Sequence, residues 1–307
     1  MELRHLRYFT AVAEALNFTR AAAQLRVAQP ALSRQIQDLE EEIGVDLLRR
    51  SPRGVTLTAE GKLFLEEVRD LLKRADESVA KVRALARGEY GELHVGYAPS
   101  PSVEVLPPAL AAFQKAAPRV RVVLHDLASD EMIARLLDGT LHFGITVEPP
   151  AEVAGDIHFE ELRRYPFCIA LAARHPFARK KSVTLAEVAS QPLVGLRRRD
   201  YSEYHQMLDR LFSPLNLRPR IAVECDGSTS MLTELEAGNA IGIVSDLFRR
   251  IAGRRLVYRR VSDSTESHSV GITRAVKGDV TPAGEKFCEI LRQVAGDLRG
   301  AKARSKA

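Results

Sequence analysis

The sequence of 307 residues is poor in cysteine and has no long apolar run. Its three cysteines, Cys168, Cys225 and Cys288, are odd in number and far apart, which favours free thiols in a reducing compartment over a disulfide framework. No apolar run approaches the ~18–20 residues that a membrane-spanning helix needs, and the N-terminus lacks the apolar core of a signal peptide. We therefore expect a soluble, cytoplasmic protein with no membrane partner.

Sites for metals, cofactors and covalent catalysis are also missing. The eight histidines are scattered without ligand spacing, and no Cys/His pattern suggests zinc. There is no Gly-x-Ser-x-Gly elbow and no glycine-rich phosphate loop. The sequence predicts no metal, no cofactor and no enzymatic activity. The competing class is an enzyme or solute-binding protein that carries a DNA-binding motif incidentally, and a signal peptide or a nucleophile–base motif would have favoured it.

The most informative stretch is a helix expected to begin near Gln29. Leu32, Ile36, Leu39 and Ile43 follow the spacing of a buried helical face. Hydroxyl, amide and guanidinium groups on the other face can reach base edges and phosphates. Proline in the first turn costs no hydrogen bond there. The DNA-binding candidates in this helix are Gln29, Pro30, Ala31, Ser33, Arg34 and Gln37.

The flanks of that helix complete a winged helix-turn-helix. An apolar face between Leu6 and Leu16 predicts a first helix, and Thr19 is expected to cap a short helix through Leu25 and to belong to the DNA-binding surface. Residues 46–58 read as two short strands around a Pro/Arg/Gly turn. Arg50 and Arg53 lie at or near its tip, where an arginine can enter a minor groove. The alternative to a DNA-binding surface is a solvated helical face with ordinary surface arginines.

A long helix is predicted from Thr58 to about Arg87. Apolar residues form two adjacent stripes along it, which is more than a monomeric surface helix needs and is typical of a coiled-coil partner. Packing against the chain's own domains is the alternative. The dimerisation candidates are Phe64, Val68, Leu71, Leu72, Val79 and Val82.

After Gly88 the pattern changes to strands that alternate with helices, which predicts parallel sheets. A late strand (269–274) and a late helix (281–298) most simply return to the first sheet. Two α/β lobes joined by two crossing strands would result. The predicted elements are strands 93–97, 120–126, 143–147, 167–172, 192–196, 221–225 and 240–244, and helices 103–116, 129–138, 185–189, 201–212 and 230–237.

Several separately spaced motifs carry a family resemblance. Leu6-Arg7-Tyr8-Phe9, Asn17-Phe18-Thr19-Arg20-Ala21-Ala22, Ala28-Gln29-Pro30-Ala31-Leu32-Ser33 and Thr56-Leu57-Thr58-Ala59-Glu60-Gly61 resemble the N-terminal domain of LysR-type transcriptional regulators. Arg174-His175-Pro176-Phe177 and the segment 236–243 are similar to motifs of that family's effector domain.

The resemblance implies an α/β architecture with three parts. They are a winged helix-turn-helix (1–58), a linker helix for dimerisation (59–88) and a two-lobed, periplasmic-binding-protein-like (type 2) effector domain (91–307). Lobe I would hold about 91–162 and 267–299, and lobe II about 163–266. The linker would pair subunits on a palindromic operator.

Ligands of open α/β sheets bind beyond the carboxyl ends of the strands, where loops enter helices. Ser100 and Ser129 stand there and could meet an anion with hydroxyls and free N–H groups, although serine at this position is also an ordinary cap. Thr146 falls where some relatives carry arginine, so a carboxylate clamp cannot be assumed. The effector-binding candidates are Ser100, Pro101, Ser102, Ser129, Thr146, Tyr201, Tyr204 and Asp226.

A sensor thiol is a further hypothesis for Cys225, although no cysteine is near it in sequence and Asp226 would oppose thiolate formation. Altogether we expect a sequence-specific transcriptional regulator that binds double-stranded operator DNA. It would be a dimer or a homotetramer (a dimer of dimers), with a possible contact to RNA polymerase. A small-molecule effector, expected to be a small organic acid, would bind between the lobes.

Overall fold

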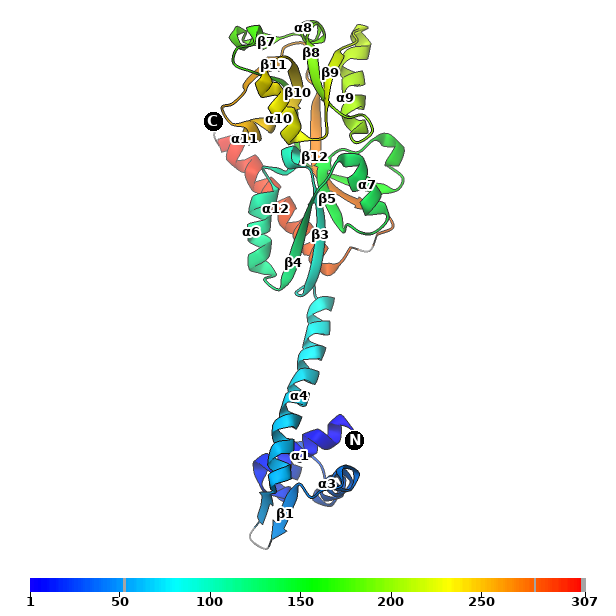
Figure 1. The fold of residues 1–307 in the computed structure, drawn as a ribbon, viewed down its shortest axis with the longest axis vertical. Helices are drawn as coiled ribbons and strands as arrows, with labels where there is room; N and C mark the ends of the chain where they lie inside the picture. The colour runs from blue at the N-terminus through cyan, green and yellow to red at the C-terminus, as the bar shows by residue number, and fades with distance from the viewer. Residues whose placement is uncertain (52–53, 279, 305–307) are drawn as a thin grey trace. The chain divides into compact units, whose positions relative to one another are not determined.

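The computed structural model describes residues 1–51, 54–278 and 280–304 (Figure 1). The chain divides into two compact units, Met1–Ala84 and Leu85–Ala307. The first is mainly helical, and the second contains both lobes of an α/β fold. These are the α/β class and the element types that the sequence predicts.

The first unit begins with three helices, α1 (Leu3–Ala15), α2 (Phe18–Leu25) and α3 (Gln29–Ile43). Leu32, Ile36 and Leu39 of α3 are fully buried against α1 and α2, so the predicted apolar face is confirmed. Pro30 lies in the first turn, and α3 ends at Gly44, whose φ of 84° is one that residues with a side chain rarely adopt. This core presents the opposite face of α3 to solvent.

The start of α2 differs from the prediction. Asn17, not Thr19, is the N-cap, because its side chain accepts a hydrogen bond from the N–H of Arg20 at 2.9 Å. Phe18 is buried in the core and begins the helix one residue before Thr19, which leaves Thr19 exposed in the first turn. The prediction that Thr19 caps this helix was wrong.

A hairpin and a long helix complete the first unit. Strands β1 (Leu48–Ser51) and β2 (Gly54–Leu57) pair antiparallel, and α4 runs from Ala59 to Ala86. The Thr58 hydroxyl accepts a hydrogen bond from the N–H of Gly61 at 2.8 Å, which caps α4. A Cβ at Gly61 would lie 2.0 Å from the carbonyl oxygen of Leu47, so only glycine fits where α4 crosses the hairpin.

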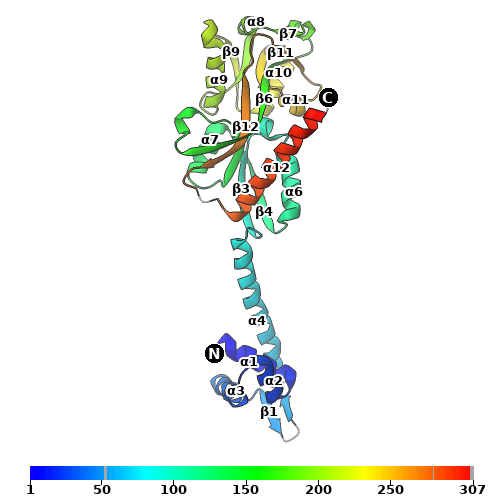
Figure 2. The same cartoon turned by 180° about the vertical axis from the view of Figure 1, so that it is seen from behind.

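Lobe I of the second unit is built on five strands in the order β4-β3-β5-β12-β6. Helices α6 (Leu106–Ala116) and α12 (Pro282–Arg304) lie together on one side of this sheet, and α7 (Ser129–Leu137) lies on the other, as Figures 1 and 2 show from opposite sides. The predicted helix 103–116 corresponds to α6, which begins three residues later, and the sequence did not predict the short helix α5 (Pro99–Ser102). The strands are β3 (Gly91–Tyr97), β4 (Val120–Asp126), β5 (Phe143–Val147), β6 (Ile157–Leu171) and β12 (Ser267–Ala275).

Lobe II contains the order β6-β10-β8-β9, and β11 pairs with β6 and with β7. The buried residues of lobe II form a large apolar core of their own. The sequence did not predict β7, α11 or β11. The strands are β7 (Ser182–Val183), β8 (Pro192–Leu196), β9 (Arg220–Cys225), β10 (Ile241–Ser245) and β11 (Val257–Val261), and the helices are α8 (Leu185–Ala189), α9 (Ser202–Phe212), α10 (Ser228–Ala237) and α11 (Phe248–Ala252).

Strand β6 joins the two lobes. It pairs with β12 as far as Pro166 and with β10 and β11 from Phe167 onward. The chain crosses again between β11 and β12, as predicted. The prediction found only the part of β6 from Phe167, because the preceding segment of the strand alternates with charged residues.

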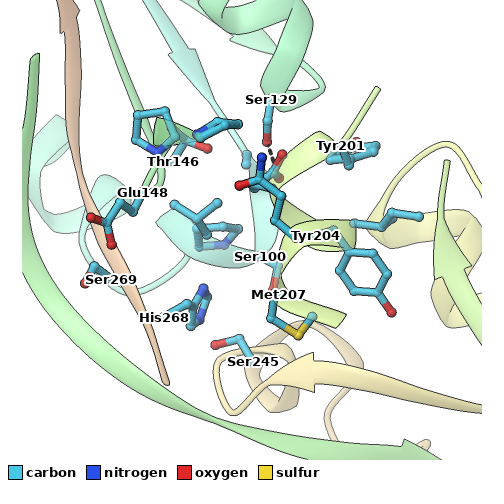
Figure 3. Close-up of a pocket in the computed structure, with 18 of the residues that line it drawn as sticks. Ser100, Ser129, Thr146, Glu148, Tyr201, Tyr204, Met207, Ser245, His268 and Ser269 are labelled. Atoms are coloured by element: carbon cyan, nitrogen blue, oxygen red, sulfur yellow. Dashed lines mark hydrogen bonds between the residues drawn. The ribbon is translucent and has the colours of Figure 1, made fainter. Parts of the chain in front are cut away.

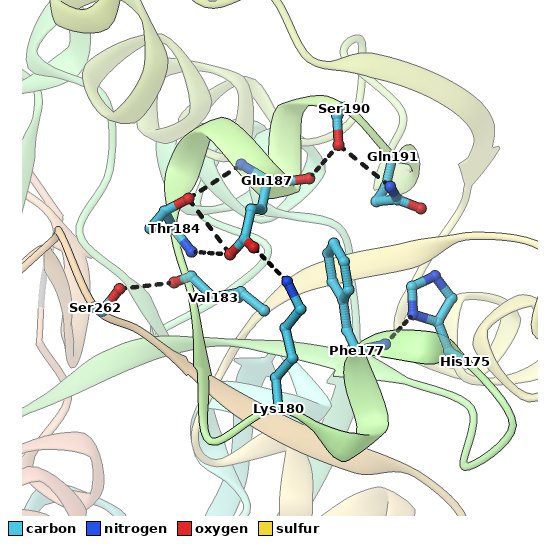
Figure 4. Close-up of polar contacts among 9 residues, drawn as sticks. All are labelled: His175, Phe177, Lys180, Val183, Thr184, Glu187, Ser190, Gln191 and Ser262. Carbon is cyan, nitrogen blue, oxygen red and sulfur yellow. Dashed lines mark hydrogen bonds and ion pairs between the residues drawn. The ribbon is translucent and has the colours of Figure 1, made fainter.

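Local capping explains why short elements form in lobe II (Figure 4). Thr184 and Glu187 make a capping box that starts α8, and Lys180 forms an ion pair with Glu187. The His175 ring accepts a hydrogen bond from the N–H of Phe177 at 3.2 Å. The Arg174 guanidinium donates to the carbonyl of Ala237, which joins the two motifs of this lobe that the sequence singled out.

Candidate nucleic-acid interface and ligand cleft

The polar face of α3 is free in the part of the chain that the structure describes. Arg34 and Gln37 are exposed, and neither side chain makes a hydrogen bond or an ion pair with a described residue. Ser33 is half-buried beside them. The remaining exposed candidates at the start of the helix are Gln29, Pro30 and Ala31. A guanidinium and an amide one turn apart can contact base edges without breaking an internal bond.

The wing is tied to α3 by Arg50. Its Nη1 donates a hydrogen bond to the Ser33 hydroxyl at 2.9 Å, and its guanidinium lies 4.8 Å from the centre of the Phe18 ring. Arg50 is nonetheless exposed, so it can still meet a phosphate. Arg53 lies outside the described residues.

One acid of α3 is turned away from this surface. The Glu40 carboxylate accepts hydrogen bonds from the N–H groups of Leu47 and Leu48, each at 2.9 Å. Its negative charge therefore organises the entry to the hairpin. The exposed N-terminal half of α3 carries no acid before Asp38.

The dimerisation candidates of α4 fall into two groups. Val68 has no exposed area, and Phe64 packs on Phe9 with ring centres 5.2 Å apart, so these two belong to the chain's own core. Assigning them to a dimer seam was wrong, because the first turns of α4 pack against α1. Leu72 is half-buried. Leu71, Val79 and Val82 are 49%, 49% and 67% exposed.

A cavity of about 760 Å³ lies between the two lobes of the second unit (Figure 3). Lobe I contributes the segment 98–101, Ser129 and the end of β5, and lobe II contributes one side of α9. Apolar side chains form much of the wall, among them Phe167, Met207, Ile243 and Phe248. Its position and mixed lining are typical of a small-molecule site.

Six of the eight effector candidates line this cavity, namely Ser100, Pro101, Ser129, Thr146, Tyr201 and Tyr204. Ser102 does not, because its hydroxyl is buried and donates to the carbonyl of Ala98 at 2.7 Å within α5. Asp226 does not line it either, and its carboxylate accepts a hydrogen bond from the Ser230 hydroxyl at 2.5 Å. Both assignments to the ligand site were wrong, since the Ser102 hydroxyl bonds back within α5 and the Asp226 carboxylate bonds a side chain near the start of α10.

The candidates that line the cavity differ in whether their hydroxyl groups are free to bind a ligand. The Ser100 hydroxyl makes no hydrogen bond with a described residue, and the Thr146 hydroxyl is buried without a partner among them. The hydroxyl of Tyr204 points away from the cavity, and burial raises its pKa (Figure 3). Tyr201 donates to the carbonyl of Asp226 at 3.1 Å.

Ser129 does not present a free hydroxyl to a ligand. It donates to Oε1 of Glu203 at 2.7 Å, the bond drawn as a dashed line in Figure 3. Burial raises the pKa of Glu203 to about 7, although the bonds from Ser129 and from backbone N–H groups at the start of α9 oppose this change. The position predicted for an anionic ligand is therefore filled by a carboxyl group of the protein.

Among the polar residues of the cavity wall that sequence reasoning missed, two are central to its chemistry, Glu203 and His268. Glu203 lies in the first turn of α9, where an acid is expected merely to complement the helix dipole. His268 of β12 has a buried Nε2 with no partner among the described residues, and burial lowers its pKa to about 4. His268 directly precedes the predicted strand 269–274, so no sequence signal pointed to it.

The three cysteines are free and buried. Burial raises the pKa of Cys168 and Cys288 to about 12 and also raises that of Cys225. Raised pKa values disfavour the reactive thiolate, which does not support a redox role for Cys225. Within the described ranges, no group of three or more His, Cys, Asp or Glu side chains could hold a metal ion, and no helix is long and apolar enough to span a bilayer.

Comparison with known proteins agrees with this arrangement over nearly the whole chain. Residues 3–62 match the family described as bacterial regulatory helix-turn-helix protein, lysR family, and residues 86–296 match the LysR substrate binding domain. The chain is 33% identical over 290 residues to the HTH-type transcriptional regulator AlsR of Bacillus subtilis (strain 168), covering 94% of this chain and 95% of AlsR. It is 34% identical over 297 residues to the regulator TcbR of Pseudomonas sp. (strain P51), covering 97% and 100%.

A solved structure supports the same assignment. Full-length CbnR in complex with its target DNA superposes with a TM-score of 0.78 and 32% identity, and the match covers 96% of this chain and 100% of CbnR. The chain therefore belongs to the LysR family, and it is a DNA-binding transcriptional regulator with an effector-binding domain, not an enzyme.

Proposed function

We propose that α3 reads operator DNA through Arg34, Gln37 and the residues at its N-terminal end, while Arg50 of the wing contacts the backbone. The observation that carries this proposal is the free, exposed state of Arg34 and Gln37 on a helix whose other face is fully buried. Arginine and glutamine form bidentate hydrogen bonds with guanine and adenine. Support also comes from CbnR, whose full-length structure is a complex with target DNA.

The operator complex would contain more than one copy of the chain. Leu71, Val79 and Val82 form an exposed apolar stripe on α4, and such a stripe is stable in water only when a second helix covers it. We infer a homodimer through α4, with a dimer of dimers as the larger assembly. In this division, residues 59–88 are the dimerisation element between a DNA-binding domain (1–58) and an effector domain (91–307).

The cleft would bind the small-molecule effector. The free hydroxyl of Ser100 and the buried, unpartnered hydroxyl of Thr146 would recognise its polar atoms, and the apolar wall would hold its body. A ligand that contacts both lobes stabilises one relative arrangement of them, and this is the change that would alter the operator complex. The protein would act in the cytoplasm, where operator DNA is located.

Alanine substitution of Arg34 tests the DNA-binding proposal. Loss of a bidentate base contact should weaken operator binding by about 1–3 kcal/mol while non-specific binding falls less. Arg69→Ala is the matched control, because Arg69 is an exposed arginine of the same unit that is ion-paired with Glu14. Fluorescence anisotropy with the intergenic DNA beside the protein's gene, at one fixed salt concentration, measures both. Equal loss in the two variants would contradict the proposed role of Arg34.

A thermal-shift screen tests the effector site. A small molecule present at ~100 times its dissociation constant stabilises the folded state by about 2.7 kcal/mol. Ser100→Ala should weaken the ligand and leave operator affinity without ligand unchanged. A ligand that stabilises Ser100→Ala and Thr146→Ala as well as the wild type would place the effector elsewhere.

A further inference from the structure

Side chains at the starts of α7 of lobe I and α9 of lobe II bond to each other across the cleft. The Ser129 hydroxyl at the start of α7 donates to Glu203 of α9 at 2.7 Å. In return, the Asp130 carboxylate of α7 accepts hydrogen bonds from the hydroxyl and the N–H of Ser202 at 2.7 and 3.2 Å. The N-terminus of α9 is thus supplied with a carboxylate, while at the start of α7 the Ser129 hydroxyl is occupied by Glu203 and the N–H of Asp130 donates to the carbonyl of Asp200 at 3.2 Å.

The surroundings of Glu203 are acidic. Asp130 of α7 is the charged group that acts on Glu203, whereas Asp200, before the start of α9, is already paired with Arg197 at 2.8 Å. Oε2 of Glu203 is buried and accepts no hydrogen bond from a described side chain. Two further acids line the cavity, Glu148 and Glu266, and both are exposed. A second carboxylate placed beside Ser129 would meet repulsion from several sides.

The cations of the cavity are not placed to offset this repulsion. Arg164 is exposed and its guanidinium pairs with Glu161 at 2.7 Å. Arg210 is exposed near the end of α9, two turns beyond Glu203. His268, a half-buried side chain of the wall whose Nε2 is shielded from solvent, is held neutral by burial at pH 7.

We propose that Glu203 is a specificity-determining residue of the cleft, because it occupies the carboxylate position at the start of α7 and makes the cleft select a ligand that donates a hydrogen bond. This inference rests on the proposed function, since it assumes that the effector binds in the cleft. It replaces the expectation of an organic acid bound at Ser129 with a neutral or cationic compound whose donor meets Oε2 of Glu203. Thr146 Oγ1 and His268 Nε2, both buried and unpartnered among the described residues, would pair with the ligand's other polar atoms.

A pair of isosteric probes tests the proposal. Benzoate and benzamide have nearly the same size, and only benzamide is neutral and donates hydrogen bonds. Isothermal titration of the full-length wild type at pH 8, where Glu203 is mostly ionised, should show benzamide binding more tightly than benzoate. Glu203→Ala removes the carboxylate that occupies the position beside Ser129. We therefore expect the affinity for benzoate to rise at least about 10-fold, because a like charge at short range is lost. Adding Ser129→Ala should reduce that gain, because the hydroxyl that Glu203→Ala frees for the ligand is then missing.

Two further variants test whether any gain depends on the charge and the position of Glu203. Glu203→Gln removes the charge but keeps an acceptor for Ser129, and it should give an intermediate gain for benzoate in a protein with the same fold. Glu148→Gln removes an exposed carboxylate of the same cavity that makes no side-chain bond to Ser129, and it should give a smaller gain than either Glu203 variant.

Benzoate affinity that is equal in the wild type and in Glu203→Ala, whether measurable or absent in both, would overturn the proposal. Wild-type binding of benzoate at least as tight as that of benzamide would do so as well. A different result would show that the cleft is not the effector site at all. In that case, no small molecule in the thermal-shift screen would stabilise the wild type more than Ser100→Ala.

Discussion

Replacing Glu203 by glutamine should change how the stability of this regulator depends on pH. Burial raises the pKa of Glu203 from its ordinary 4.5 to about 7 in the folded protein. Below pH 4.5 the group is protonated in both the folded and the unfolded chain and contributes nothing. Between pH 4.5 and 7 the unfolded chain releases the proton first, so the free energy of unfolding falls as the pH rises, and the cost is complete above pH 7.

The magnitude follows from the two pKa values. Their difference of about 2.5 corresponds to about 3 kcal/mol at 1.36 kcal/mol for each pKa unit, an upper figure because the side chain is not fully shielded from water. Glutamine cannot ionise, so the wild type should lose up to about 3 kcal/mol relative to Glu203→Gln between pH 4.5 and 8.

Urea unfolding of both proteins at several pH values, followed by circular dichroism, measures this difference. Any lost packing or hydrogen bonding in the variant adds an offset that is the same at every pH, so the slope alone is diagnostic. Glu266→Gln is the control, because it removes an exposed carboxyl of the same cavity. The difference in free energy of unfolding between this variant and the wild type should not change with pH. Parallel curves for wild type and Glu203→Gln would refute the burial of an ionisable group at this position.

Three further outcomes are expected. Burial lowers the pKa of His268 from 6.5 to about 4, so the wild type loses stability as the pH falls through this window, and His268→Asn should abolish that loss in the same urea series. Ser33→Ala removes the acceptor of Arg50, so it should weaken operator affinity in an anisotropy titration, whereas an unchanged affinity would mean that this bond does not position the wing. Leu71→Asp combined with Val79→Asp should dissociate the dimer in analytical ultracentrifugation, and a monomeric wild type at micromolar concentration would contradict the α4 seam.

Much of the fold could be predicted because local signals agree with the tertiary structure. The helix from Gln29 combines an apolar stripe, a proline in the first turn and a terminal glycine, and these fix its face and both ends. The predicted strands 120–126, 143–147 and 192–196 match β4, β5 and β8 residue for residue, since each apolar run is closed by polar or turn-forming residues.

The failures occurred where tertiary contacts override local preference. Phe18 is drawn into the core and starts α2 early, so Asn17 rather than Thr19 becomes the cap. Val68 follows the heptad pattern of a dimer seam, yet it is already fully buried within its own chain. A sequence pattern shows that a face is apolar, but it does not show which surface covers that face.

The sequence predicted where the candidate site lies, but only some of the side chains that determine its chemistry. Ser100, Ser129 and Thr146 were found because the carboxyl ends of parallel strands meet at one edge of a sheet. Glu203 could not be found, because its role depends on α9 of lobe II approaching α7 of lobe I, a contact across 74 residues. The same contact converts Ser129 from a ligand donor into a partner of a protein carboxyl group.

We expect a ligand in the cleft and operator DNA to affect each other's binding through this chain. The most direct test takes a compound that stabilises the wild type and not Ser100→Ala, and measures its dissociation constant by titration with and without saturating operator DNA. Linkage requires that the operator change the affinity for the ligand by the same factor by which the ligand changes the affinity for the operator. We predict matching factors of about 5 to 150, the usual range of allosteric coupling. Identical ligand affinity with and without operator DNA would contradict the account.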